Sequence, residues 1–157
     1  MSFEKVKNYL SNFGVGDRVL EFDVSSATVG LAAEAVGCAP AKIAKSLTFM
    51  VEECPVMIVC AGDMKIDNSK FKEQFKTKAK MLAFEDVETL IGHKVGGVCP
   101  FAICDGVKVY LDESLKRFDM VYPACGSDSS AIGLSLSELE RYAQNFCGYV
   151  DVCKTIE

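Results

Sequence analysis

The chain has 157 residues, half of them apolar, a size and composition typical of one globular domain. It contains no run of 18 or more apolar residues, which argues against a membrane span, and its net charge of −5 argues against broad coating of nucleic acid. The eight cysteines form no Cys-x-x-Cys pair and are accompanied by one histidine, so the sequence predicts no metal site. Several cysteines lie in apolar runs, where free thiols pack as small apolar groups, and we expect a reducing, cytoplasmic setting.

The first forty residues combine two helix signals with one strand signal. Ser2 is a candidate N-cap for a helix over residues 3–12, which the glycines after it would end. Residues 18–24 are predicted to form a strand. A polar cluster at residues 25–28 then supplies a cap for an alanine-rich helix that ends near Gly37.

A short helix begun by Pro40, over residues 40–44, leads into a predicted strand at residues 44–51 that carries an unusual lysine. Period-two alternation places Lys45 on one face of this strand with three apolar residues. Such a lysine either points its ammonium into the protein or a cleft, where an unpaired charge is costly, or snorkels to solvent from the end of the strand. The residues alone leave both readings open.

Residues 55–61 are apolar throughout and predict a buried strand that forms a hairpin with the Lys45 strand. Asp67 or Asn68 caps the next helix, over about residues 69–76. Residues 64–80 carry six lysines against two acidic residues, a local excess of +4. This segment is either a solvated face or a patch that contacts phosphates.

A helix over residues 85–91, stopped by Gly92, is followed by a glycine-rich loop at residues 93–101. Glycines allow main-chain N–H groups to approach a ligand, although an ordinary turn has the same composition. We place His93 on the surface of this loop. Cys99 is expected to pack rather than to act as a nucleophile, because the sequence offers it no activating base.

The dipeptide Asp105-Gly106 predicts a hairpin turn between residues 101–104 and 107–112. Asp112 either orients Lys45 or caps the segment that follows. The remaining predicted segments are a strand at 119–124, a polar loop at 125–130, a short strand at 131–134, a helix at 136–145 capped by Ser135 or Ser137, and a closing segment at 148–153. Hairpin-like strand pairs between helices predict an α/β domain of the α+β type, with a mixed and mainly antiparallel sheet.

Five motifs occur in a fixed order: AKIAKSLTF, a buried strand ending in AGD, IGHKVGGVCPF, VYLDESLKRF and the late YPACGS loop. From about Thr28 to Leu139 this set resembles the YbaK/prolyl-tRNA-synthetase editing-domain family of free-standing aminoacyl-tRNA deacylases. The resemblance implies a single domain over residues 1–157, with a strongly curved sheet and peripheral helices. It also implies hydrolysis of the ester of mischarged tRNA, typically proline tRNA carrying cysteine or alanine, without a metal, a cofactor or a classical triad.

Carried over residue by residue, the resemblance makes Lys45 the catalytic residue. It assigns substrate binding to two loops, which are thought to hold the terminal adenosine and the ester: Gly96, Gly97, Val98, Cys99, Pro100, Phe101, Gly126 and Ser127. The expected partner is the acceptor end of mischarged aminoacyl-tRNA, with a synthetase as a further candidate and neither DNA nor a membrane. Expected tRNA contacts are Lys70, Lys72 and Lys76. Two other readings stay open: a non-catalytic module that binds aminoacyl-tRNA or a synthetase, and a hydrolase of another small acyl ester.

Overall fold

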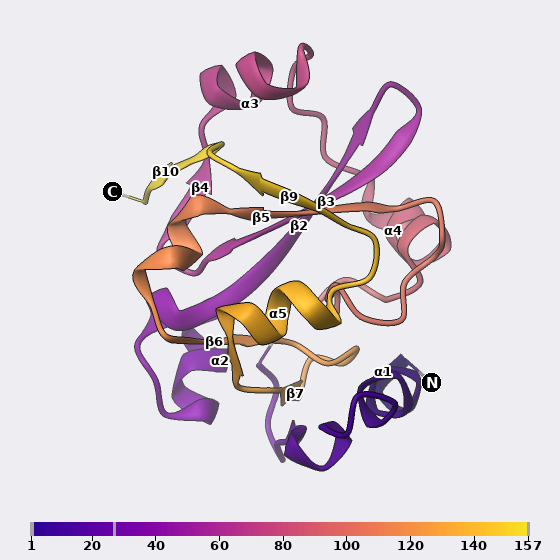
Figure 1. The fold of residues 1–157 in the computed structure, drawn as a ribbon, viewed down its shortest axis with the longest axis vertical. Helices are drawn as coiled ribbons and strands as arrows, with labels where there is room; N and C mark the ends of the chain where they lie inside the picture. Colours follow the sequence, from indigo (N-terminus) through magenta and orange to yellow (C-terminus); the bar gives the residue numbers. More distant parts are fainter. Residues whose placement is uncertain (1, 27, 157) are drawn as a thin grey trace.

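A curved sheet of six strands forms the centre of the structure, and helices lie at its periphery (Figure 1). The computed structural model describes residues 2–26 and 28–156; residues 1, 27 and 157 of the expected domain lie outside this description. In spatial order, the sheet contains β8 (Leu134–Ser135), β6 (Met120–Pro123), β2 (Ile43–Val51), β3 (Cys54–Ala61), β5 (Lys108–Asp112) and β9 (Phe146–Val150). Two short ladders pair β1 (Leu20–Glu21) with β7 (Ser130–Ala131) and β4 (Met64–Ile66) with β10 (Cys153–Thr155).

The described helices are α1 (Ser2–Ser11), α2 (Val29–Val36), α3 (Asn68–Phe75), α4 (Phe84–Ile91) and α5 (Leu136–Tyr142). Short 3-10 turns occur at Gly16–Arg18, Pro40–Lys42 and Glu113–Arg117. Of the seven strand pairings in the described residues, four are antiparallel and three are parallel. The structure confirms the predicted α+β class, with a mixed, mainly antiparallel sheet.

The β2–β3 hairpin carries Lys45 in its first strand, as predicted. The antiparallel register places Lys45 directly opposite Cys60. Glu52 and Glu53 connect the strands with positive φ angles of 49° and 66°, the left-handed geometry of a tight two-residue hairpin turn. The hairpin therefore fixes where along the sheet the Lys45 side chain emerges.

Alternate side chains of this hairpin face two separate apolar cores. The larger core collects buried side chains from the sheet and from α1, α4 and α5, among them Leu10, Val59, Ile91, Leu111 and Leu139. The smaller core contains Phe49, Ile58, Cys60, Phe71 and Val152. Directly opposite residues of an antiparallel pair share a face, so Lys45 lies on the face of the smaller core.

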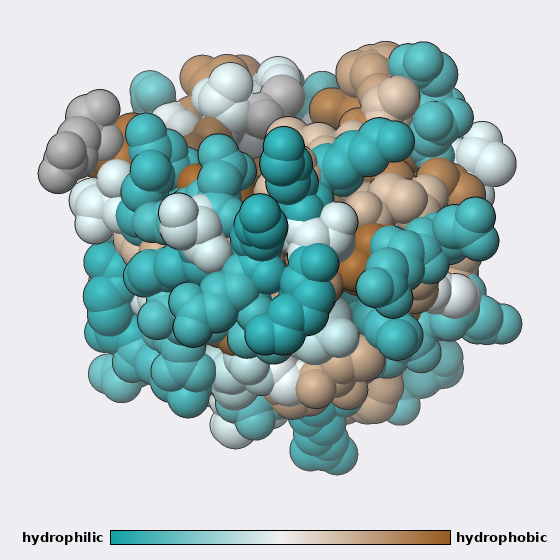
Figure 2. All heavy atoms as spheres, turned by 90° about the horizontal axis from the view of Figure 1, so that it is seen from above, coloured by the Kyte–Doolittle hydropathy of each residue, from teal (hydrophilic) through white to brown (hydrophobic). Residues whose placement is uncertain are grey.

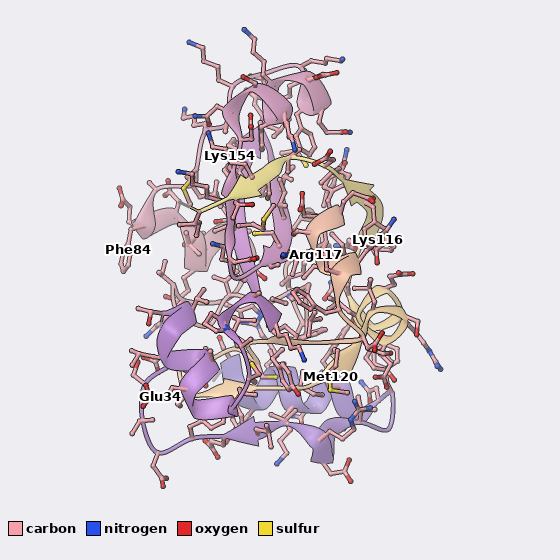
Figure 3. The ribbon with its side chains drawn as sticks, turned by 90° about the vertical axis from the view of Figure 1, so that its left-hand side faces the viewer. Glu34, Phe84, Lys116, Arg117, Met120 and Lys154 are labelled. Atoms are coloured by element: carbon pink, nitrogen blue, oxygen red, sulfur yellow. The ribbon has the colours of Figure 1, made fainter. Side chains whose placement is uncertain are left out.

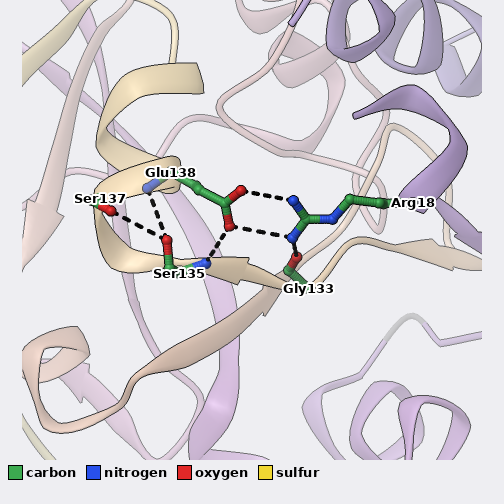
Figure 4. Close-up of polar contacts among 5 residues, drawn as sticks. All are labelled: Arg18, Gly133, Ser135, Ser137 and Glu138. Carbon is green, nitrogen blue, oxygen red and sulfur yellow. Dashed lines mark hydrogen bonds and ion pairs between the residues drawn. The ribbon is translucent and has the colours of Figure 1, made fainter. Parts of the chain in front are cut away.

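Local capping signals are confirmed at three helices. Thr28 Oγ1 accepts the Leu31 N–H at the start of α2, and Asp67 accepts two main-chain N–H groups at the start of α3. Ser135 and Glu138 form a reciprocal capping box at α5, and Arg18 donates to Glu138 at 2.7 Å (Figure 4). The hydrogen bonds from Arg18 lower the pKa of Glu138 to about 2, so the carboxylate that completes the cap is ionised at neutral pH.

The predicted hairpin at Asp105-Gly106 is wrong. Residues 101–104 do not form a strand; the Gln144 side chain instead pairs with both the N–H and the C=O of Ile103 at 2.9 Å. β5 joins the sheet through parallel pairing with β3 and β9. A distant amide side chain thus performs the pairing that the local sequence had suggested for a neighbouring strand.

Several predicted boundaries near the ends of the chain are also corrected. Ser2 lies inside α1, and its hydroxyl donates to the Gly92 C=O at 3.4 Å rather than capping the helix. The strand expected at 18–24 shrinks to β1, because the chain first makes a 3-10 turn. The short helix expected at 40–44 is a three-residue 3-10 turn, after which β2 begins. The closing segment 148–153 divides between β9 and β10, which pair with different strands.

Candidate functional site

A cavity of about 430 Å³ opens beside the first half of β2. Its walls come from β2, α2, α4, the glycine-rich loop (residues 93–101) and β7, and we call it the main cavity. Apolar side chains form most of the wall: Val29, Ala32, Ile43, Ala44, Leu47, Leu82, Val87 and Val98. The polar side chains among them are few and include Lys45, Ser46 and Thr48. A mostly apolar cavity with a few polar groups is the usual form of a small-molecule site.

Lys45 lies in the wall of this cavity and is half-buried. Within residues 2–26 and 28–156, no carboxylate is within ion-pair distance of its ammonium. The pKa of the nearby Asp63 is lowered mainly by hydrogen bonds from Arg117 and to a smaller extent by the charge of Lys45. Arg117 occupies the Asp63 carboxylate with contacts of 2.6 and 3.0 Å, so the Lys45 ammonium remains available to a ligand in the cavity.

The glycine-rich loop contributes Gly96 and Val98 to the main cavity. Gly96 has φ +100°, a conformation that favours glycine. Gly97 faces the other way: a Cβ built there would lie 2.6 Å from the carbonyl carbon of Gly126 and 2.7 Å from the N of Ser127. The two loops that the sequence motifs single out are therefore packed backbone against backbone.

A second cavity, of about 590 Å³, lies on the other side of this loop. Gly97, Gly126 and Ser127 line it together with Lys5 and Lys94. The side chain of Val95 borders both cavities. The predicted substrate-binding residues are thus divided between two adjoining spaces.

Three predicted substrate-binding residues, Cys99, Pro100 and Phe101, are buried behind the loop and line neither cavity. Burial raises the pKa of the Cys99 thiol to about 12, so the thiol is protonated at neutral pH and is a poor nucleophile. Phe101 belongs to the larger apolar core. These residues support the loop from inside, in line with the packing role expected for Cys99.

The expected surface position of His93 is wrong, because the side chain is fully buried. Its Nε2 lies 2.7 Å from the Phe101 C=O and 3.6 Å from Cys99 Sγ. The contact with a carbonyl assigns the proton to Nε2 and leaves the buried Nδ1 without a partner among the described residues. His93 thus ties the first residue of the loop to its last residue.

Asp112 has the capping role of the two that the sequence left open. Its carboxylate accepts the N–H of Ser114 at 2.9 Å and the N–H of Val152 at 3.0 Å. It begins the 3-10 turn after β5 and fixes the segment that leads into β10. Both carboxylate oxygens are engaged in these structural contacts.

The α3 lysines lie away from the main cavity, at the end of the molecule where Figure 1 shows α3. Hydrophilic side chains cover most of this end in Figure 2. Lys70 is engaged with Asp151 and with the Cys153 C=O, both at 3.1 Å. Lys72 and Lys76 are exposed.

The motifs did not point to the apolar rim of the main cavity, formed by Met81, Phe84 and Val95. Their side chains are 60%, 75% and 51% exposed. Figure 3 shows Phe84 projecting from α4 at the edge of the molecule, on the same side as α2. Helical periodicity places Phe84 on one stripe with Val87 and would have predicted burial, so no local signal distinguishes it. Ser46 was missed for a related reason, since it alternates with Lys45 on the opposite face of the strand.

The fold and the cavity are those of a domain that binds a small, largely apolar group beside a strand lysine. The family model described as "Aminoacyl-tRNA editing domain" matches residues 24–142. The chain belongs to this family.

Relatives and solved structures agree with this assignment. The chain is 46% identical to "Uncharacterized protein YwhH" of Bacillus subtilis over the full length of both. It is 29% identical to a proline--tRNA ligase of Levilactobacillus brevis over 110 residues, which cover 69% of this chain and 19% of the ligase. "Crystal structure of a putative trans-editing enzyme for prolyl tRNA synthetase" describes a neighbour with TM-score 0.85 and 27% identity, covering 98% of this chain and 97% of the other. Together, the family and this neighbour support a deacylase-like role.

Two further observations bear on cofactors and membranes. The described residues contain no group of three or more His, Cys, Asp or Glu side chains that is placed to hold a metal ion. None of the helices in the described ranges is long and apolar enough to cross a membrane.

Proposed function

We propose that this protein is a cytoplasmic aminoacyl-tRNA deacylase that hydrolyses the ester of mischarged tRNA in translation quality control. The observation that carries the proposal is Lys45, whose ammonium has no carboxylate partner in the described residues and borders a mostly apolar cavity beside Gly96. The family match over residues 24–142 supplies the substrate class. An aminoacyl ester is already activated, so orientation and electrostatic stabilisation suffice for its hydrolysis.

Lys45 acts in this proposal as the stabilising cation. The carbonyl oxygen gains negative charge as the ester is attacked, and a fixed ammonium in a partly dry cavity stabilises that charge more strongly than water does. The protonated, buried Cys99 does not serve as the nucleophile. The resemblance to the family instead implies attack by a positioned water, assisted by a hydroxyl of the substrate's ribose.

Proline tRNA carrying alanine or cysteine is the proposed substrate. The proline--tRNA ligase relatives and the trans-editing neighbour support the choice of tRNA. Val29, Ala32 and Val98 make an apolar wall that suits a small aliphatic or thiol side chain. Small apolar pockets discriminate between similar side chains by modest factors, so several small amino acids are expected to be removed at different rates.

The exposed rim of the main cavity supports a nucleic-acid end as the larger part of the substrate. Phe84 is the most exposed large apolar side chain of the described residues. Met81 and Val95 each follow an exposed lysine, Lys80 and Lys94 respectively. Bases of single-stranded nucleic acid stack on exposed aromatic rings while lysines bind the phosphates. We therefore propose that Phe84 stacks on a base of the unpaired 3′ end, beside the cavity that receives the ester.

A deacylation panel tests the proposal. Purified protein is offered alanyl-, cysteinyl-, seryl- and prolyl-tRNA, and release of the amino acid is measured against Lys45→Ala. Rapid hydrolysis of the alanyl or cysteinyl ester with prolyl-tRNA spared is the expected result. Tight binding of these tRNAs without turnover would favour the non-catalytic module instead, and turnover of simple acyl esters alone would favour a different hydrolase.

A further inference from the structure

Ser46 carries a buried hydroxyl that has no hydrogen-bond partner among the described residues, and it lies in the wall of the main cavity. Neighbouring hydroxyls are occupied. Thr28 Oγ1 accepts the Leu31 N–H, and Ser130 Oγ accepts a hydrogen bond from Ser127 at 2.8 Å. Buried polar groups in folded proteins are paired in the great majority of cases, so an unpaired hydroxyl in a cavity wall indicates a partner that binds there.

The main chain at Ser46 is open as well. Alternate residues of a strand direct their N–H and C=O groups to the same edge. On this edge of β2, Ala44 pairs with β6, and the Thr48 C=O accepts the Leu82 N–H at 3.1 Å. Ser46 lies between them, and nothing in the described part of the chain pairs with its main chain on this edge. The cavity therefore contains a gap in the sheet edge that offers an N–H, a C=O and a hydroxyl.

The charges around the gap limit what it can bind. No aspartate or glutamate lines the described wall of the main cavity, and Lys45 is the charged side chain there. A nearby ammonium favours the neutral form of an amine. A neutral amine donates N–H to a carbonyl and accepts a hydrogen bond from a hydroxyl, which are the two groups that Ser46 leaves free.

We infer that Ser46 positions the substrate by binding the α-amino group of the aminoacyl ester, an inference that rests on the proposed function. Ser46 pairs with Val59 of the larger core, whereas Lys45 lies on the face of the smaller core. The two residues thus reach the substrate from opposite faces of β2. Ser46 holds the amine while Lys45 faces the ester carbonyl, and a substrate that lacks a free amine loses the first contact.

Binding of hydrolysis-resistant analogues tests the inference. The probes are 3′-alanylamino-3′-deoxyadenosine and its N-acetyl derivative, titrated calorimetrically into the parent protein, Ser46→Ala, Ser46→Thr and Ser69→Ala. Ser69 is an exposed serine of α3 and serves as the matched control. We expect the parent and Ser69→Ala to bind the free amine about 10-fold more tightly than the acetylated form, the factor that a hydrogen bond of ordinary strength gives. Ser46→Ala should bind both equally, and Ser46→Thr should restore the preference.

Each alternative outcome separates the inference from the proposed function. A preference that survives in Ser46→Ala, or a parent protein that binds both analogues equally, overturns the role of Ser46 while deacylation of mischarged tRNA stands. Failure of the parent to deacylate any tRNA of the panel overturns the proposed function, whatever the binding ratio. The melting temperature of Ser46→Ala is expected to equal or exceed that of the parent, since no internal hydrogen bond of the hydroxyl is lost; a large decrease would make the hydroxyl structural and overturn the inference.

Discussion

A Cβ built on Gly97 would lie 2.6 Å from the carbonyl carbon of Gly126, so the two loops beside the candidate site touch through their main chains. Such a distance leaves no room for any side chain at Gly97. Gly126 is itself constrained, because it has φ +90° and packs against the Ser2 carbonyl at the start of α1. The shape of the site therefore depends on a stack of three chain segments that come from distant parts of the sequence.

Gly97→Ala is expected to lower stability as well as activity, because the added methyl group meets main-chain atoms that cannot rotate away. Overpacking of this kind typically costs about 1–3 kcal/mol. The measurement is chemical denaturation together with the deacylation rate. Gly106→Ala is the matched control, since a Cβ there meets nothing within 4 Å. Unchanged stability in Gly97→Ala would show that the loops separate without cost.

Lys45→Ala is expected to fold and to lose about 100- to 1000-fold in deacylation rate, the usual effect of removing one donor that stabilises an oxyanion. Lys45→Arg should also be slow, because a planar guanidinium does not replace a compact ammonium in a shaped cavity. Lys108→Ala, which changes an exposed lysine of β5, is the control. A Lys45→Ala rate near that of the parent would assign this lysine to solvation of the strand end.

Protonation of His93 is expected to destabilise the folded protein in mild acid. Burial lowers the pKa of His93 below its usual 6.5, so the unfolded chain binds a proton at a higher pH than the folded chain does. This contribution to stability is complete above pH 6.5 and is lost as the pH falls through the lower pKa of the folded state. Urea denaturation between pH 7.5 and 5 measures it.

His93→Gln separates this effect from other titrations, because a glutamine amide can still donate to the Phe101 C=O and does not titrate. The variant should show a flatter dependence of stability on pH in the same range. Parallel profiles for the parent and His93→Gln would mean that other groups govern acid stability.

Lys72→Gln combined with Lys76→Gln is expected to weaken tRNA binding and to reduce the slope of log affinity against log salt by about 1 for each lost phosphate contact. Lys70 is left intact, because it holds Asp151 and the Cys153 C=O. Hydrolysis of a short aminoacyl nucleoside should be unaffected, since α3 lies away from the main cavity. An unchanged salt slope would identify these lysines as part of a solvated face.

Phe84→Ala is expected to weaken binding of an aminoacylated 3′ end by about 10- to 100-fold, the range for loss of one stacked base. Phe84→Tyr should bind like the parent, because it keeps an aromatic face. Ile156→Ala, at another exposed apolar residue outside the cavity wall, is the control. Equal affinities for Phe84→Ala and the parent would exclude stacking at this position.

Features with local causes could be predicted from the sequence. The Lys45 hairpin follows from two apolar runs and a short turn, and the caps at Thr28, Asp67 and Ser135 follow from side chains that bond their own helix. The order of motifs identified the family before any coordinates were considered. These signals act over a few residues, so a single sequence contains them in full.

Features created by contacts between distant segments could not be predicted. Gln144 lies far along the chain from Ile103, yet it replaces a strand that the turn at Asp105 had suggested. His93 is buried because the core closes over the loop, whereas its neighbours in the sequence suggested solvent. The position of Ser46 in a gap of the sheet edge depends on where β6 stops pairing, which no spacing in the sequence reveals.

The late strands have a consequence for synthesis of the chain. β9 covers an edge of β5, and β10 pairs with β4, more than eighty residues earlier in the sequence. Until Thr155 has left the ribosome, the nascent protein presents unpaired strand edges, which are favourable sites for aggregation. The final folding step is therefore expected after translation, and chaperones that bind exposed strands during elongation should increase the yield of soluble protein.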